Sequence, residues 1–130
     1  MKYLLDTDTI SYLFQGRETV VSTFVEMRPS SVAISAISVA ELRLGARRKG
    51  AKKINNWLDV FFENVTVLPF DQAAAEVFGQ TANKLLRAGT PIGQNDTMIA
   101  SQALANNLSV VTHNQKHFSR ISGLKTEDWF

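Results

Sequence analysis

The sequence contains no cysteine, which excludes a disulfide scaffold and any metal site built on thiolates. It has no apolar run near the roughly 20 residues that a membrane-spanning helix needs. Its N-terminus also lacks the basic stretch and long apolar core of a signal peptide. We therefore expect a cytoplasmic protein with no membrane contact, and any bound metal must be held by oxygen or histidine.

Linker-like segments are also missing, because no stretch rich in Pro, Gly and Ser divides the chain. At 130 residues, with 45% hydrophobic and 20% charged residues, the chain has an ordinary globular composition. Short apolar runs at residues 3–5, 32–35, 65–69 and 108–112 alternate with stretches of helical periodicity. We predict a single domain over residues 1–130, of α/β class, with a central, mostly parallel sheet of about four or five strands flanked by helices.

Three acids, Asp6, Glu41 and Asp96, stand where an apolar strand gives way to a helix or where a helix begins. In an open parallel α/β sheet the strand ends share one edge, so acids far apart in sequence can converge there. No Lys or Arg adjoins Asp6 or Asp96. Carboxylates brought together without cations raise one another's pKa and cost stability unless a bound ion compensates. A hard, oxygen-ligated Mg²⁺ or Mn²⁺ suits that requirement.

Each acid also has an ordinary structural explanation. Asp6, between strand and helix, is typical of an N-cap, and Ser38 with Glu41 fits the S-x-x-E capping box. Asp96 falls in a first helical turn, where the helix dipole favours an acid. Each explanation covers one acid, and none accounts for the lack of positive charge around them.

Four ordered blocks of residues resemble the PIN-domain ribonucleases and, within them, the VapC-type toxins. The blocks are Leu4–Asp8, Ser38–Leu42 with Gly45, Pro91–Asp96 with Ile99 and Ala100, and Val110–Asn114 with Phe118. The resemblance extends from Met1 to Glu127–Trp129 and so covers essentially the whole chain. Asn114 departs from the pattern, because many PIN domains have a fourth acid there, although some VapC-like toxins have Asn. Asp8 stands where the family more often shows Asn.

The resemblance implies a metal-dependent endoribonuclease, the toxin of a type II toxin-antitoxin pair, which hydrolyses RNA phosphodiester bonds. Asp6, Glu41 and Asp96 would then hold one or two Mg²⁺ or Mn²⁺ ions, and Asn114 would be a catalytic helper that orients water. Thr112, at a strand exit, is expected to hydrogen-bond a carboxylate and fix its rotamer, with Thr7 in the same supporting layer.

Partners follow from the same resemblance. It implies a VapB-like antitoxin, encoded alongside, that covers the acid-lined groove. It also implies a structured RNA substrate, which in several relatives is a transfer RNA. Apolar stripes at helical spacing over residues 57–62 and 74–78 predict core packing. They exceed what a small sheet needs, which predicts further surface buried in a homodimer or under the antitoxin.

A basic segment follows Glu41, although the net charge is only +2. Its residues are Arg43, Arg47, Arg48, Lys49, Lys52 and Lys53. A solvated helix face is the ordinary explanation for such a charge run. Phosphate contact is the functional one, because Lys and Arg that neutralise a nucleic-acid backbone contribute binding energy by counterion release. Their proximity in sequence to Glu41 leads us to predict RNA binding.

Two other functions fit parts of the same sequence. The stretch Asp6–Thr9 is close to the D-x-D-x-[T/V] start of haloacid-dehalogenase phosphatases, but the last position falls on Ile10 and breaks the motif. A PIN-like module that binds RNA or protein without cutting is the other alternative, and the three intact acids argue against it. His113 lies beside Asn114 at the expected edge, where we favour a surface or supporting role because oxygen-rich metal sites need no imidazole.

Overall fold

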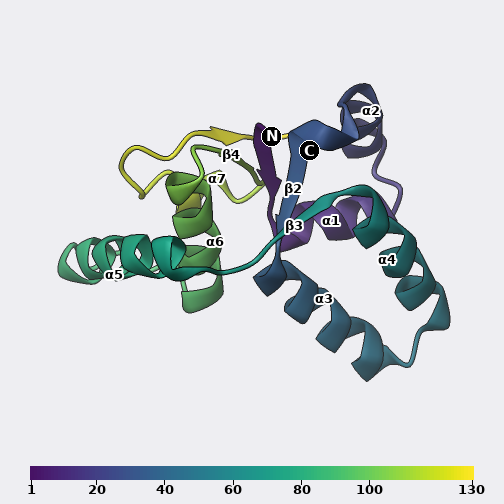
Figure 1. The fold of residues 1–130 in the computed structure, drawn as a ribbon, viewed down its shortest axis with the longest axis horizontal. Helices are drawn as coiled ribbons and strands as arrows, with labels where there is room; N and C mark the ends of the chain where they lie inside the picture. Colours follow the sequence, from purple (N-terminus) through teal and green to yellow (C-terminus); the bar gives the residue numbers. More distant parts are fainter.

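Five short strands form one parallel sheet in the computed structural model, which describes residues 1–130 (Figure 1). The strands are β1 (Tyr3–Leu5), β2 (Val32–Ser35), β3 (Thr66–Leu68), β4 (Ser109–Val111) and β5 (Thr126–Glu127). Their order across the sheet is β3-β2-β1-β4-β5, and every neighbouring pair runs parallel. The predicted α/β class is confirmed. The brief strand β5 was not predicted, because two residues carry no periodic signal.

Strand β1 lies at the centre of the sheet, with Leu5 opposite Ile34 of β2 and Val111 of β4. The chain first extends the sheet from β1 through β2 to β3, and it then returns to the other side of β1 with β4. Strand order therefore reverses beside β1. In open α/β sheets such a reversal marks the edge where ligands bind, outside the carboxyl ends of the strands.

Seven α-helices connect the strands, and a 3-10 turn at Pro29–Ser31 precedes β2. The helices are α1 (Thr7–Phe14), α2 (Glu18–Glu26), α3 (Ala36–Lys49), α4 (Lys52–Asn64), α5 (Gln72–Arg87), α6 (Gln94–Ala105) and α7 (Gln115–Phe118). Figure 1 shows α1, α2 and α4 on one side of the sheet and α5, α6 and α7 on the other. None of these helices is both long and apolar enough to span a bilayer.

Two apolar clusters, one on each face of the sheet, form the core. Leu5 belongs to the first cluster, together with Ile10 of α1 and Phe61 of α4. Leu4 points the other way and joins Ile99 of α6 in the second cluster. Alternate residues of one strand thus enter opposite cores, and both faces are covered, as is usual for a parallel sheet.

The aromatic stripe of α4 packs inside the first cluster. Trp57 stacks on Phe61 with a centroid distance of 4.8 Å and an interplanar angle of 12°. Its ring also meets the edge of Phe14 from α1, at 5.5 Å. The prediction that this stripe serves packing is confirmed. On α5, by contrast, Leu86 is 67% exposed, and burial in a homodimer stays a prediction.

Helices α3 and α4 form a hairpin that runs away from the sheet and back (Figure 1). Helix α3 is capped by Ser35, whose hydroxyl accepts a hydrogen bond from the Ile37 backbone N–H at 2.9 Å. The capping-box explanation for Ser38 and Glu41 is therefore wrong, because both residues lie inside the helix. Gly50 ends α3 with φ of 61°, a left-handed conformation that favours glycine.

Candidate active site

Asp6 follows β1 directly and is only 4% exposed. Its Oδ1 accepts a hydrogen bond from the Thr9 backbone N–H at 2.8 Å, so it caps α1 as one explanation predicted. The Thr112 hydroxyl, from the end of β4, also hydrogen-bonds this carboxyl. Burial raises the pKa of Asp6 above its ordinary value, although the bonds from Thr112 and Thr9 act in the opposite direction. A cap alone does not require such burial.

Glu41 reaches the same edge from α3. The Thr7 hydroxyl lies 2.7 Å from Glu41 Oε1 and 2.9 Å from the Ser38 hydroxyl. A carboxylate can only accept, so Thr7 donates its single proton to Glu41 and receives a proton from Ser38. Thr7 is half-buried and Ser38 is buried, so Thr7 holds the Glu41 carboxylate directly and Ser38 orients the Thr7 hydroxyl.

Asp96 stands in the first turn of α6, three residues after Gly93. Gly93 has φ of 98°, which a residue with a side chain adopts only with strain. Burial raises the pKa of Asp96 to about 6, with further contributions from the negative charges of Asp6, Glu41 and, least of the three, Asp8. Asp96 and Glu41 also line one cavity of about 360 Å³. The fold therefore brings the three predicted acids within electrostatic reach of one another.

No cation neutralises these acids. The structure has two side-chain ion pairs, Arg43 with Asp59 and His113 with Asp128, and neither includes any of the three. The carboxylates are held by hydroxyls and a backbone N–H instead. A cluster of negative charge supported only by neutral donors favours a bound cation.

The donor set fits a hard divalent ion, since it consists of carboxylate oxygens with hydroxyls behind them. No group of three or more acidic, histidine or cysteine side chains is close enough to ligate one ion as the side chains stand. Mg²⁺ commonly keeps several waters and uses only one or two carboxylates directly. Asp6, Glu41 and Asp96 therefore suit an ion whose ligand shell is completed by water.

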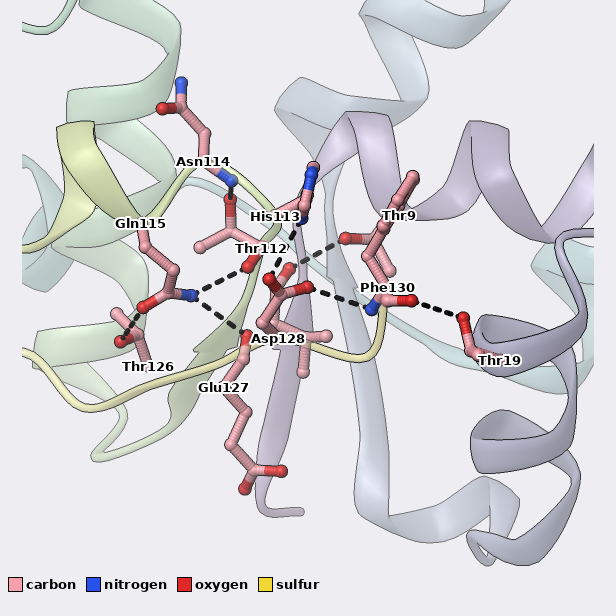
Figure 2. A network of polar contacts seen from close by, with 11 residues as sticks. Thr9, Thr19, Thr112, His113, Asn114, Gln115, Thr126, Glu127, Asp128 and Phe130 are labelled. Atoms are coloured by element: carbon pink, nitrogen blue, oxygen red, sulfur yellow. Dashed lines mark hydrogen bonds and ion pairs between the residues drawn. The ribbon is translucent and has the colours of Figure 1, made fainter.

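Asn114 contributes differently from the three acids. Its backbone N–H donates to the Thr112 hydroxyl at 2.9 Å, and its amide Nδ2 lies 2.9 Å from His117 Nδ1. In Figure 2 the Asn114 side chain points away from the rest of the network drawn. Its backbone thus supports Thr112, which in turn holds Asp6, while its amide contacts a histidine in place of a carboxylate.

His113 belongs to a network that joins the segment after β5 to α1 and α2 (Figure 2). Its Nδ1 lies 2.9 Å from an Asp128 carboxylate oxygen, and its ring stacks on Phe130 at 3.9 Å. Arg17 lies over Phe130, also at 3.9 Å. These contacts fix the loop that carries Thr112. The sequence offered no signal for them, because the contact between Arg17 and Phe130 joins opposite ends of the chain.

Ser38 is a supporting residue that the sequence indicates only as part of a capping box, which the structure does not form. Its position three residues before Glu41 puts both on one face of α3, and that spacing was the available signal. Between α1, α3 and α4 lies a groove of about 350 Å³, to which Glu41, Thr7, Lys49 and Trp57 all contribute. One wall of this groove is acidic and the rest is largely apolar.

The basic segment does not form one surface. Arg43 is held by α4, where its guanidinium donates to the Asn55 carboxamide at 3.0 Å and pairs with Asp59. Lys49 lines the groove that holds Glu41. The other cationic residues of the segment are exposed. They are Arg47, Arg48, Lys52 and Lys53.

Comparison with known proteins gives a consistent result. The PIN domain family model matches residues 3–124. The chain is 35% identical over 130 residues to the tRNA(fMet)-specific endonuclease VapC of Salmonella typhimurium, covering 99% of this chain and 98% of that relative. It is 33% identical over 132 residues, with the same coverage, to Ribonuclease VapC2 of Rickettsia felis.

Solved structures agree in fold. The DNA-bound VapBC structure from Salmonella typhimurium superposes with a TM-score of 0.93 at 35% identity, covering 100% of this chain and 99% of that one. VapBC2 from Rickettsia felis, bound to a promoter DNA fragment, gives a TM-score of 0.90 at 32% identity and covers both chains completely. The similarity thus includes every element that carries the three acids.

Proposed function

Because this chain belongs to the PIN-domain family and, within it, to the VapC endoribonuclease toxins, we propose that Asp6, Glu41 and Asp96 form its nuclease centre. The observation that carries the assignment is the convergence of the three acids at one sheet edge, where burial and the charges of Asp6 and Glu41 raise the pKa of Asp96 and no ion pair includes any of the three. Strongly perturbed carboxyls at a sheet edge are typical of functional sites. The family match excludes the alternative that this chain is a haloacid-dehalogenase-like phosphatase.

The three acids would hold Mg²⁺ or Mn²⁺ directly or through water. An ion bound there supplies an activated water and a positive charge against the scissile phosphate. Asp6 is anchored by the first turn of α1 and by Thr112, so its carboxyl cannot swing away. Thr7 restrains Glu41 in the same way. The protein thus prepares the ligands before substrate arrives, which is how supporting contacts raise activity.

The substrate we propose is a structured RNA, in particular a transfer RNA. Two relatives, from Shigella flexneri and Salmonella typhimurium, are named as tRNA(fMet)-specific endonucleases. The groove beside Glu41 supports this assignment, because Lys49 gives it a cation and Phe14 and Trp57 give it apolar walls. Nucleotides of an exposed RNA loop bind well to such a groove, because the cation contacts their anionic phosphates and the apolar walls contact their flat bases.

The partner we propose is a VapB-like antitoxin that covers this groove. The similar solved structures are VapBC complexes, some of them bound to DNA. An arginine from the antitoxin would pair with the acidic wall in place of the metal, because guanidinium groups bind carboxylates through two parallel bonds. A homodimer that covers exposed apolar residues of α5, such as Leu86, completes the proposed assembly.

A cleavage assay on bulk transfer RNA, with and without Mg²⁺ or Mn²⁺, tests the nuclease centre. Glu41→Gln and Asp96→Asn should each abolish cleavage without unfolding the protein, because each removes one charge from a repelling cluster. Asn114→Ala should be milder, since its amide touches no carboxylate. Asn114→Asp should keep activity and bind metal more tightly.

The matched control is Asp8→Asn. Asp8 is an exposed acid in the first turn of α1, and the substitution makes the same chemical change. Its charge also raises the pKa of Asp6 and Asp96, so this control separates a ligand from a neighbouring charge. Cleavage should survive it. If Glu41→Gln or Asp96→Asn cut RNA as fast as the control, the proposed centre would be wrong. If a chelator did not reduce RNA cleavage, the proposal that these acids hold a catalytic metal ion would be wrong.

A further inference from the structure

The outer side of the α3–α4 hairpin holds a cavity of about 520 Å³ with no hydrophobic residue in its lining. It lies between the last turns of α3 and the first turns of α4. Its side chains are those of Arg43, Arg47, Lys52, Asn55, Asn56 and Asp59. Three cations face one carboxylate, so the cavity is positively charged overall. We call it the flank cavity.

The cations of the flank cavity differ in how they are held. Arg43 is fixed, because it donates to the Asn55 carboxamide, pairs with Asp59 and lies 5.1 Å from the centre of the Phe62 ring. Arg47 and Lys52 make no ion pair and no side-chain hydrogen bond in the structure. Their charges are therefore free to bind an anion beside a guanidinium that is already in place.

The fold gives Lys52 no stabilising task. It stands in the first turn of α4, which has no acidic residue there and no side-chain cap at Ala51. The positive end of a helix dipole disfavours a cation. Arg47, in the last turn of α3, is favoured by its dipole. The helix dipole therefore accounts for the position of Arg47 but not for that of Lys52. A bound anion between the two side chains would stabilise both positive charges.

The flank cavity is separate from the catalytic groove. Arg43 and Arg47 are four residues apart and share one face of α3. Glu41 and Lys49 line the groove on a different face. A helix with its side chains is about 10 Å across, so α3 divides the two sites. A polyanion that occupies both must extend around the hairpin, which a few nucleotides at the cleavage point cannot do.

We propose that the flank cavity is a second phosphate-binding subsite, which engages a part of a folded RNA distant from the bond that is cut. This inference rests on the proposed function, because RNA is the polyanion it invokes. Arg47 and Lys52 carry the contact, and Arg43 with Asn55 shapes it. The subsite favours structured RNA over short single strands, since only the former reaches both sides of α3.

The test compares two charge-matched double variants. Arg47→Ala with Lys52→Ala removes the free cations of the flank cavity. Arg48→Ala with Lys53→Ala removes the same charge from neighbouring positions on the same helices, outside the cavity lining. All four residues are exposed, so neither pair should disturb the fold. Binding of bulk transfer RNA is measured by fluorescence anisotropy in chelator at several salt concentrations, which keeps the test independent of the metal site.

We expect the flank pair to weaken transfer-RNA binding about 10-fold and to reduce the salt slope by about two. The control pair should change affinity less than about 3-fold. On an oligonucleotide of about three nucleotides, which is too short to reach around α3, both double variants should bind as the unaltered protein does. Asp59→Asn should act in the opposite direction and tighten transfer-RNA binding, because it removes the one negative charge of the cavity.

If the two double variants weakened transfer-RNA binding equally, the subsite proposal would be wrong, and RNA would bind to the positive charge of the hairpin as a whole. An equal loss on the short oligonucleotide would show that these residues act at the cleavage point. Loss of a copurified antitoxin, with RNA binding unchanged, would assign the cavity to a protein partner. Failure of the proposed function has a different signature, because the unaltered protein would then bind or cleave no RNA at all.

Discussion

Asp6 and Asp71 perform the same local task with different consequences. Each caps a helix, and each accepts a hydrogen bond from the backbone N–H three residues later, at 2.8 Å for Asp6 and 2.9 Å for Asp71. Asp71 is exposed, whereas Asp6 is 4% exposed and stands at the centre of the sheet edge. Burial raises the pKa of Asp6. Helix capping therefore says little about the function of an aspartate, which depends on where the fold places its carboxyl group.

Asp59 extends the comparison to charge. It is an exposed carboxylate paired with Arg43 across the α3–α4 hairpin. Asp96 is half-buried, near two other acids, and has no cation. The protein pairs a carboxylate that is already well solvated and leaves unpaired the ones that suffer most from burial. Such an arrangement costs stability unless a bound ligand brings the missing charge.

The largest expected difference separates Asp6→Asn from Asp71→Asn. Asn caps helices about as well as Asp, so both variants should keep their caps. Asp6→Asn removes the charge of a proposed metal ligand, and RNA cleavage should fall at least about 1000-fold. Asp71→Asn should leave cleavage unchanged. Rates measured at saturating Mn²⁺ check this, and comparable activity in the two variants would abolish the distinction between the two aspartates.

Thr7→Val sharpens the comparison at a neutral residue. Val has nearly the shape of Thr but cannot donate to Glu41, whose carboxylate would lose its 2.7 Å contact. Supporting contacts of this kind are worth about 10- to 100-fold in metal affinity or activity. We expect a higher Mn²⁺ requirement, with part of the activity recovered at high Mn²⁺. Thr7→Ser should behave as the unaltered protein, and an unchanged Mn²⁺ titration of the Thr7→Val protein would remove Thr7 from the site.

The pH dependence of stability tests whether unpaired burial is costly. The pKa of Asp96 is raised to about 6, so the folded protein holds this proton more tightly than the unfolded chain. Metal-free stability should therefore fall as pH rises from about 4 to about 6 and stay low above that. Asp96→Asn should stabilise the metal-free protein by about 1 to 2 kcal/mol at pH 7, allowing for solvent screening, and by little near pH 4.

Urea unfolding in chelator, at both pH values, measures this effect. A variant no more stable than the unaltered protein at pH 7 would show that burial of the Asp96 charge and its repulsion by the other acids cost nothing in the folded state. Added Mg²⁺ should stabilise the unaltered protein more than the variant, because the ion relieves the same repulsion.

The smallest expected effect concerns the ordinary cap. Asp71→Ala leaves the Ala74 backbone N–H without its 2.9 Å partner and should cost about 1 kcal/mol of stability. RNA cleavage, measured well below the unfolding temperature, should not change. A loss of activity in the folded Asp71→Ala protein would mean that the end of α5 communicates with the sheet edge, and the contrast with Asp6 would weaken.

Much of the site could be predicted because it depends on position along the chain. Acids that follow parallel strands or begin helices must approach one sheet edge, and this placed Asp6 and Asp96 together. The supporting contacts depend on side-chain geometry instead. The hydroxyl of Thr7 reaches Glu41 because α1 and α3 are in contact, and spacing along the sequence does not encode that contact.

Contacts between helices were the least predictable. The division of the basic segment depends on the angle between α3 and α4, which brings Arg43 to Asp59 and leaves Arg47 free. No local pattern encodes that angle. The contact of His113 with Asp128 and Phe130 is similar, because it requires the segment after β5 to fold back over α1. Residue type and spacing predicted which acids converge, while packing determined how their side chains are held.

The register of β1 against β4 has a consequence for synthesis. Leu5 and Val111 are neighbours in the sheet, although nearly the whole chain separates them. On the ribosome, the first acid therefore emerges long before the strand that completes its surroundings, and pairings over such a distance form late. Until β4 arrives, Asp6 lacks Thr112, and β1 has no neighbouring strand on one side. We expect a nascent chain to be harmless to the RNA around it, with toxicity beginning only when translation is nearly finished.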